Sequence, residues 1–170
     1  MANKKMKNFL ITLIIILIPT KSFGLIEVDI TRGNLNPLPL AVSPLSIDEK
    51  SRKSFEKILK KENIGSEISG IVENNLRTSG LFNPLNKDAF LQKPDIANLK
   101  PRFEDWNLIK AQALITGKVS YVEEKLRVEF RLWDVLAGKE MMALAFTTVP
   151  NNWRRVGHII TDKVYERLTG

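Results

Sequence analysis

Few residues in the chain could carry catalytic or metal-binding chemistry. It has no cysteine, which excludes a cysteine nucleophile, an iron–sulfur cluster and a zinc site built on thiolates. His158 is its single histidine, so any site that needs two imidazoles is excluded as well. A Ser–His–Asp site would need a serine on a strained turn, and the sequence holds no G-x-S-x-G motif. We therefore expect His158 to lie on the surface of a helix, paired with Asp162 one turn away.

Two pairs of adjacent carboxylates are the remaining candidates for acid–base chemistry. Asp48 and Glu49 form one pair, and Glu123 and Glu124 form the other. Both lie in expected loops or turns, where nothing raises their basicity or places them across a cleft. The glycines do not form the G-x-G-x-x-G pattern of a dinucleotide-binding loop. We therefore expect no catalytic residue, no cofactor and no metal, and the chain is predicted not to be an enzyme.

Residues 1–24 are typical of a secretory signal peptide rather than of the fold. Three lysines stand within the first seven residues, and 9–18 is a run of ten residues that are all apolar except Thr12. Ser22 and Gly24 are small residues at the spacing that signal peptidase requires, so cleavage is expected after Gly24. Ten residues make about 15 Å of helix against a hydrocarbon core of about 30 Å, which argues against a membrane anchor. We expect export and no stable anchor after cleavage.

Removal of this segment changes the charge of the protein. The whole chain has a net charge of +7, but residues 1–24 contain four of its 26 basic residues and no acidic one. The remaining 146 residues therefore carry 22 basic and 19 acidic residues, a net charge of +3. A balance so close to neutral gives little support to nucleic-acid binding, and no nucleic-acid partner is expected.

Apolar residues at helical spacing predict two main helices. In the first, Ser66 is expected as the N-cap, Ile68 and Leu76 belong to the apolar stripe, and Gly80 follows the end. The second helix runs over 153–168, with one apolar face. A short helix is expected over 103–109, whereas 84–101, with its three prolines, is expected to be a loop.

Alternating apolar and polar residues predict five strands. A short strand over 26–30 comes first, followed by an apolar stretch at 38–45 whose prolines are expected at its ends. The clearest signal is an antiparallel meander over 113–123, 126–132 and 142–148. Its tight turn is expected at 124–125 and its second turn at 134–139.

The segment 46–63 is unusual because it carries ten charges in eighteen positions. A phosphate-binding patch and a solvated, partly helical loop are both compatible with such a composition. Basic and acidic residues are interleaved, and Phe55 is its one aromatic residue. This pattern favours the solvated, partly helical loop.

Five segments, taken in order, resemble the family of TolB N-terminal domains. They are 26–33 (IEVDITRG), 40–45 (LAVSPL), 64–85 with its S-G-x-F ending, 113–141 with its ITG-x-V strand, and the closing helix 153–170. The segment 46–63 fits the family pattern poorly. The resemblance implies one mixed α/β domain over 25–170. It is expected to be a layered α/β/α sandwich with a mixed sheet of about five strands and two main helices, similar to anticodon-binding domains.

The resemblance also implies a role. The family belongs to the Tol–Pal system of the cell envelope, which connects the inner membrane, the periplasm and the outer membrane. That system supports outer-membrane integrity, cell division and protein import or translocation. The chain is accordingly expected to be a non-enzymatic interaction domain in the periplasm.

In the family, the mature N-terminal strand engages the inner-membrane protein TolA, and a C-terminal β-propeller engages the lipoprotein Pal. The resemblance therefore implies a partner-binding segment for a TolA-like protein made of Leu25, Ile26, Glu27, Val28, Asp29, Ile30 and Thr31. Its alternating pattern suits a strand that adds to the sheet edge of another protein. Because the sequence ends at Gly170, where the propeller would begin, a Pal-like partner is expected only if a propeller is supplied elsewhere.

A second interpretation stays open at this stage. The chain could instead be a stand-alone exported module of the same fold that binds a ligand or a peptide. The reading frame after codon 170 would distinguish the two, since a propeller frame favours the Tol–Pal role.

Overall fold

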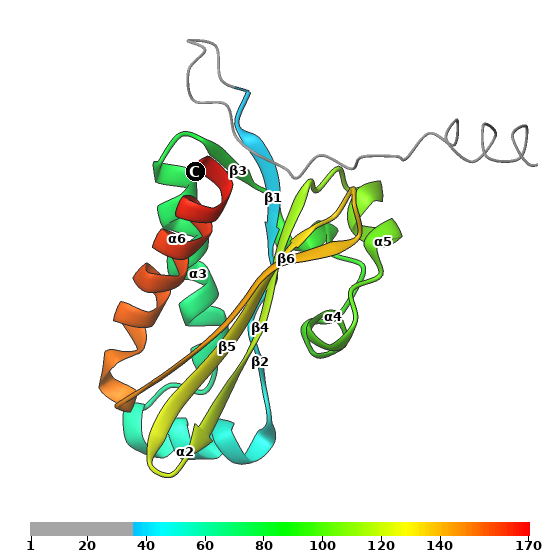
Figure 1. Cartoon of the computed structure of the whole chain (residues 1–170). Coiled ribbons are helices and arrows are strands. Elements are labelled where there is room, and N and C mark those ends of the chain that lie inside the picture. Colours follow the sequence, from blue (N-terminus) through cyan, green and yellow to red (C-terminus); the bar gives the residue numbers. More distant parts are fainter. Residues whose placement is uncertain (1–35) are drawn as a thin grey trace, which may run out of the picture.

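A mixed β-sheet organises residues 36–170, the part of the chain that the structure describes; the structure is a computed structural model (Figure 1). The strand order is β3-β1-β4-β5-β6, and the short β2 also pairs with β4. β1 runs parallel to both β3 and β4, whereas β5 is antiparallel to both of its neighbours, β4 and β6. The strands are β1 (Leu38–Val42), β2 (Ser46–Ile47), β3 (Phe82–Pro84), β4 (Ala113–Val122), β5 (Lys125–Asp134) and β6 (Lys139–Thr148).

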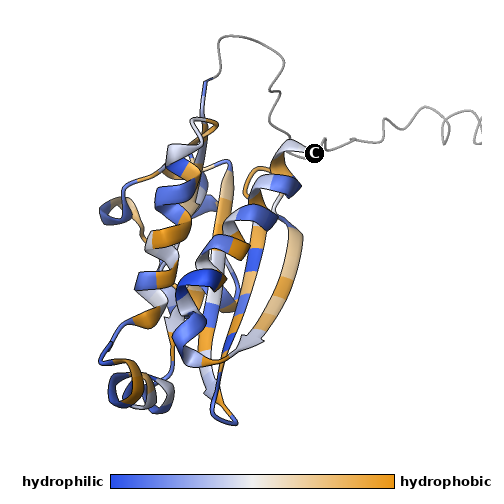
Figure 2. Cartoon of the chain, turned by 90° about the vertical axis from the view of Figure 1, so that its left-hand side faces the viewer, coloured by the Kyte–Doolittle hydropathy of each residue, from blue (hydrophilic) through white to orange (hydrophobic). Residues whose placement is uncertain are grey.

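Helices cover both faces of this sheet. The two long helices, α3 (Ile64–Thr78) and α6 (Trp153–Thr169), lie side by side on one face (Figure 2). The short helices α4 (Pro94–Leu99) and α5 (Phe103–Leu108) lie on the opposite face, and α2 (Glu49–Leu59) crosses one end of the molecule (Figure 1). The predicted α/β/α sandwich with a mixed sheet and two main helices is therefore confirmed.

Two apolar clusters hold these layers together. The larger one joins the sheet to α3 and α6, and fully buried members include Ile68 of α3, Ile160 of α6 and Phe130 of β5. The smaller one lies under α4 and α5 and is centred on Trp106 and Leu114. β4 contributes to both clusters, which explains why its buried part reads as a nearly continuous apolar run.

The charged segment 46–63 forms a regular helix over most of its length. Asp48 caps α2 by accepting a hydrogen bond of 2.8 Å from the backbone N–H of Ser51. Phe55 is fully buried and packs edge-on against Tyr121 of β4, with 5.4 Å between the ring centroids. The expected solvated, partly helical loop is correct for the exposed charged residues. It is wrong for Phe55, whose burial fixes the segment to the core.

Several expected boundaries differ from the structure. α3 begins at Ile64 rather than after an N-cap at Ser66, and its actual N-cap, Asn63, makes no side-chain capping hydrogen bond. The tight turn lies at Glu123–Glu124, one residue earlier than expected. Part of the stretch 84–101, expected to be a loop, forms α4, whose first residue is Pro94, where a missing N–H costs nothing. A helix of six residues is too short to show a repeated apolar stripe, so periodicity could not reveal it.

The fifth strand of the main path was not expected as a strand either. It is β3, whose three residues pair with Leu38, Pro39 and Leu40 of β1. The strand that was expected over 26–30 lies outside the described residues.

Candidate interaction surface

The expected partner-binding segment, 25–31, lies outside the residues that the structure describes. What the structure does show is where the chain enters the fold. Asn36 is the first described residue, and β1 follows from Leu38. β1 is an interior strand, because β3 pairs with one of its edges and β4 with the other. A strand formed by 25–31 therefore has no free edge on β1, and would need a partner elsewhere.

On the main path of the sheet, the free strand edges in the described part of the chain lie at its two ends. One belongs to β3, which has three residues, and the other to β6, which has ten. Sequence reasoning located β6 by its alternation but could not tell that it is an edge strand. The signal available was composition, since only the first two residues of β6 are charged.

His158 is exposed on α6, but the expected pairing with Asp162 is wrong. The Nδ1 atom of His158 lies 2.8 Å from Nδ2 of Asn75 on the neighbouring helix α3. The two helices approach closely at Gly157, where an added Cβ would lie 2.9 Å from Cγ2 of Ile71. This close approach brings the Asn75 amide within reach of the imidazole, so His158 joins α3 to α6.

The carboxylate pairs have structural roles. Beyond capping α2, Asp48 has a pKa below its usual value, mainly because it accepts the Ser51 backbone N–H. Glu49 lies in the first turn of the same helix and pairs with Lys53 at 3.6 Å. Glu123 and Glu124 form the exposed tip of the β4–β5 hairpin. Across residues 36–170, no cluster of three or more potential ligands is placed to hold a metal ion.

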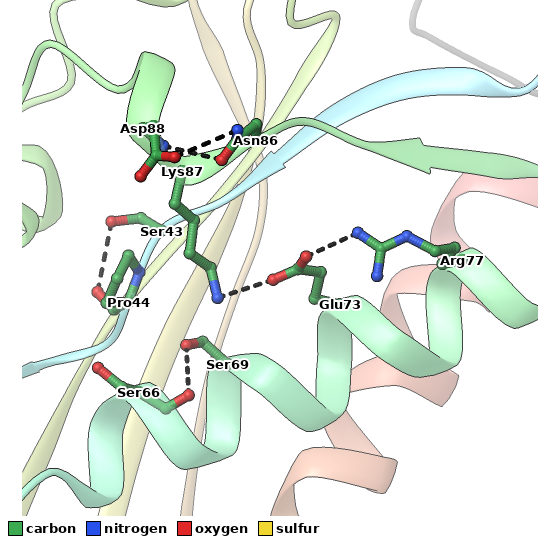
Figure 3. A network of polar contacts seen from close by, with 9 residues as sticks. All are labelled: Ser43, Pro44, Ser66, Ser69, Glu73, Arg77, Asn86, Lys87 and Asp88. Atoms are coloured by element: carbon green, nitrogen blue, oxygen red, sulfur yellow. Dashed lines mark hydrogen bonds and ion pairs between the residues drawn. The ribbon is translucent and has the colours of Figure 1, made fainter.

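A polar network fixes the connection after β3 to helix α3 (Figure 3). The half-buried carboxylate of Glu73 accepts hydrogen bonds of 2.7 Å from both Lys87 and Arg77. Burial raises the pKa of Glu73, but the hydrogen bonds from Lys87 and Arg77 outweigh it and hold this pKa below its usual value. Lys87 belongs to η1 (Lys87–Ala89), so the network ties that turn to the middle of α3. This network could not be predicted from a sequence motif, because its residues come from separate elements.

Two open hollows meet at Pro44, between β2 and the starts of α3 and α4. The larger has a volume of about 410 Å³ and is lined by Arg52, Asn63 and Asp95, among others. The smaller, of about 230 Å³, is lined mainly by the loop around Leu91. Every buried side-chain nitrogen and oxygen in the described part of the chain has a hydrogen-bond partner. Neither hollow is therefore lined by a buried polar side-chain atom that lacks a hydrogen-bond partner.

The described helices also bear on membrane contact. Within residues 36–170, every helix is too short or too polar to cross a membrane.

Comparison with known proteins decides the family. The family described as "TolB amino-terminal domain" matches residues 26–141, which is more than half of the chain. The chain belongs to the TolB amino-terminal domain family. This confirms the resemblance found in the five sequence segments. It also confirms the expectation that the chain is not an enzyme, because the TolB family is a non-enzymatic component of the Tol–Pal system.

Two similar proteins give the scale of the relationship. The Tol-Pal system protein TolB of Pelagibacter ubique (strain HTCC1062) is 82% identical over 158 residues, which cover 93% of this chain and 35% of that protein. The chain thus spans about a third of the length of this relative. The crystal structure of TolB from Acinetobacter baumannii matches with a TM-score of 0.61 and 20% identity, over 86% of this chain and 32% of the other. At that identity the likeness shows the fold alone.

Proposed function

We propose that this chain is a periplasmic interaction domain of the Tol–Pal system, and that residues 25–31 bind TolA after removal of the signal peptide 1–24. The observation that supports this proposal is the extent of the family match. The match begins at Ile26 and therefore includes nearly all of the segment 25–31. The 82% identity to a Tol-Pal system protein TolB supports the same system. A Pal-like lipoprotein is a partner only through a propeller, wherever that propeller is encoded.

The composition of the segment suits addition to a partner's sheet. Ile26, Val28 and Ile30 would share one face, and Glu27 and Asp29 the other. In this mode the backbone hydrogen bonds supply affinity, and the apolar side chains occupy pockets of the partner. The two carboxylates set the charge that the partner must complement. Since both edges of β1 are already paired, binding need not disrupt the described sheet.

The test compares the exported chain with a variant that lacks 25–31 and keeps the signal peptide. N-terminal sequencing of the periplasmic wild-type protein should begin at Leu25. The wild type should be captured by the immobilised C-terminal domain of TolA, and the deletion variant should not. Circular dichroism and thermal unfolding establish that the variant keeps its fold.

A point variant tests the same proposal without shortening the chain. Val28→Asp places a charge in the centre of the apolar face, so we expect capture by TolA to be lost. Thr31→Ser, at the polar end of the segment, is the matched control and should bind as the wild type does. Unchanged capture by both the deletion variant and Val28→Asp would refute the proposed site. An uncleaved N-terminus recovered in the membrane fraction would refute the proposed export.

A further inference from the structure

The outer edge of β6 is an open strand edge in the described part of the molecule. β6 pairs with β5 along its whole length and with no other described strand. Every second residue of such a strand turns its N–H and C=O outward, ready to pair with another chain. Natural edges are commonly protected by proline, by charged side chains or by bulges. Here the irregularity in pairing and both charged residues, Lys139 and Glu140, lie at one end, leaving 142–148 regular and uncharged.

Within this regular part, the side chains of 142–146 are similar in size on the two sides of Leu144. Reading outward, an alanine stands on each side, at 143 and 145, followed by a large apolar residue on each side, Met142 and Phe146. Met142, Leu144 and Phe146 oppose core residues of β5, so they share the face that α6 covers. The two alanines lie on the other face, opposite Arg131 and Glu129. Leu144 is 37% exposed although it faces the core layer.

We propose that the β6 edge binds a second copy of this chain, with the two β6 strands antiparallel and a two-fold axis through Leu144. A two-fold interface requires a self-complementary surface, and the size-matched residues 142–146 provide one. In this register Leu144 faces its own equivalent, Met142 faces Phe146 of the second copy, and Ala143 faces Ala145. Large side chains therefore pack against large ones on the face that α6 covers. The alanines pack against each other on the opposite face. The two sheets become one continuous sheet.

The charges beside the edge are mostly paired, which suits an uncharged partner strand such as 142–148 of a second copy. Glu140 is bonded to Arg131, at 3.3 Å, and Lys163 to Glu166, at 2.7 Å. Arg167 donates a hydrogen bond to the carbonyl of Met141. In the antiparallel arrangement the two Met141 positions lie about 20 Å apart along the strand, beyond the Debye length of about 8–10 Å. The two arginines therefore do not oppose pairing.

A hollow beside the edge leaves room for the second copy. It has a volume of about 440 Å³ and is lined by Met142 together with residues from the last two turns of α6. In the proposed register the Phe146 side chain of the second copy lies opposite Met142, next to this hollow. Each of the two equivalent hollows would receive the same residue, as a two-fold axis requires.

Because the chain has no cysteine, single introduced cysteines can test the register directly. Leu144→Cys should form a disulfide-linked dimer on mild oxidation of the full chain, since equivalent Cα atoms at the axis lie within the reach of a disulfide. Ala143→Cys alone should not, because its equivalent is displaced by two residues along the strand, about 8 Å away. A mixture of Ala143→Cys and Ala145→Cys should form the heterodimer. Leu136→Cys, at a residue 62% exposed in the β5–β6 turn, controls for random collision.

Sedimentation of the full chain tests association without covalent cross-linking. The wild type should sediment as a dimer at sufficient concentration, and Leu144→Lys should raise the dissociation constant by about tenfold or more, because like charges then face each other. Leu136→Lys should leave association unchanged, and circular dichroism should show the same fold for all three. Three results would each overturn the proposal: a wild-type monomer at every concentration, equal cross-linking of the position 143 and 144 variants, or a dimer only after deletion of 25–31. The last would assign the edge to the N-terminal segment instead.

Discussion

At the scale of single residues, the contact between α3 and α6 depends on Gly157. A methyl group there would lie 2.9 Å from Cγ2 and 3.0 Å from Cβ of Ile71. Ile71 is β-branched and its Cβ cannot move away by rotation, so the helices would have to separate. The hydrogen bond between His158 and Asn75 spans the same contact.

We therefore expect Gly157→Ala to lower the free energy of unfolding by about 1–3 kcal/mol, as overpacking does. Gly70 is the matched control, because a Cβ there would meet nothing within 4 Å. Gly70→Ala should raise the free energy of unfolding by up to about 1 kcal/mol through helix propensity. Urea unfolding of both variants measures the difference. A stabilised Gly157→Ala would show that the two helices are free to move apart.

The Glu73 carboxylate gives the fold a dependence on pH. Its pKa is lower in the folded chain than its ordinary value of 4.5. A group with a depressed pKa stabilises the fold above its unfolded pKa, and this stabilisation is lost as the pH falls through the folded value. The relevant pH window therefore lies in the acid range, below about 4.5.

Glu73→Gln should lower the stability at pH 7 by about 1–3 kcal/mol, because Lys87 and Arg77 lose a charged acceptor. Its stability should also fall less steeply than that of the wild type below pH 4.5, the ordinary pKa of this carboxyl, so that the two curves converge in acid. Glu166→Gln is the control, since its carboxylate pairs with Lys163 in full contact with water and should contribute little. Parallel curves for Glu73→Gln and the wild type would contradict the assignment.

At the scale of elements, the β4–β5 hairpin turns through two residues that disfavour the required backbone. Glu123 and Glu124 have φ angles of 48° and 59°, in the left-handed region. A two-residue turn with both φ angles positive prefers Asn-Gly. The left-handed conformation costs an ordinary residue about 1–2 kcal/mol.

Replacing the pair by Asn-Gly (Glu123→Asn with Glu124→Gly) should raise the free energy of unfolding by about 1 kcal/mol or more. The control is Glu123→Gln with Glu124→Gln, which removes the same charges and keeps the strained backbone. If backbone strain, rather than repulsion between the carboxylates, lowers the stability of the hairpin, this control should leave the free energy of unfolding nearly unchanged. Thermal unfolding of the two double variants separates these causes.

The elements that sequence could predict are those with a repeating pattern. The alternation of Leu126, Val128 and Phe130 located β5, and the apolar stripe of α6 located the last helix, because each pattern repeats several times. β3 and α4 contain three and six residues, too few for either period to be visible. Their existence depends on pairing with β1 and on packing around Trp106, which are tertiary contacts.

The candidate sites show the same limit. The segment 25–31 is predicted as a binding site from its amphipathic pattern and a family resemblance. The β6 edge could not be recognised from its own residues, because the order of strands makes it an edge. The pairing of His158 was mispredicted since Asn75 is 83 residues away in the sequence.

At the scale of the whole molecule, both proposed interactions use strand edges, and they lie on separate parts of the chain. The segment 25–31 precedes the interior strand β1, whereas β6 closes the far side of the sheet. Binding of TolA and association of two copies would therefore not compete for the same backbone groups. The deletion of 25–31 and the Leu144→Lys variant each remove one interaction, so combining them would show whether the two are independent.

The position of β1 also constrains when the domain can form. Leu38 pairs with Phe82, 44 residues later, and Leu40 pairs with Ala113, 73 residues later. Until β4 has been synthesised, the first strand has no second neighbour and its apolar side chains have no complete core. Contacts so distant in sequence form slowly, since a long loop must close before they contribute. A nascent chain of this topology thus cannot complete its fold through most of its synthesis, and an incompletely folded polypeptide can still be threaded through a narrow translocation channel.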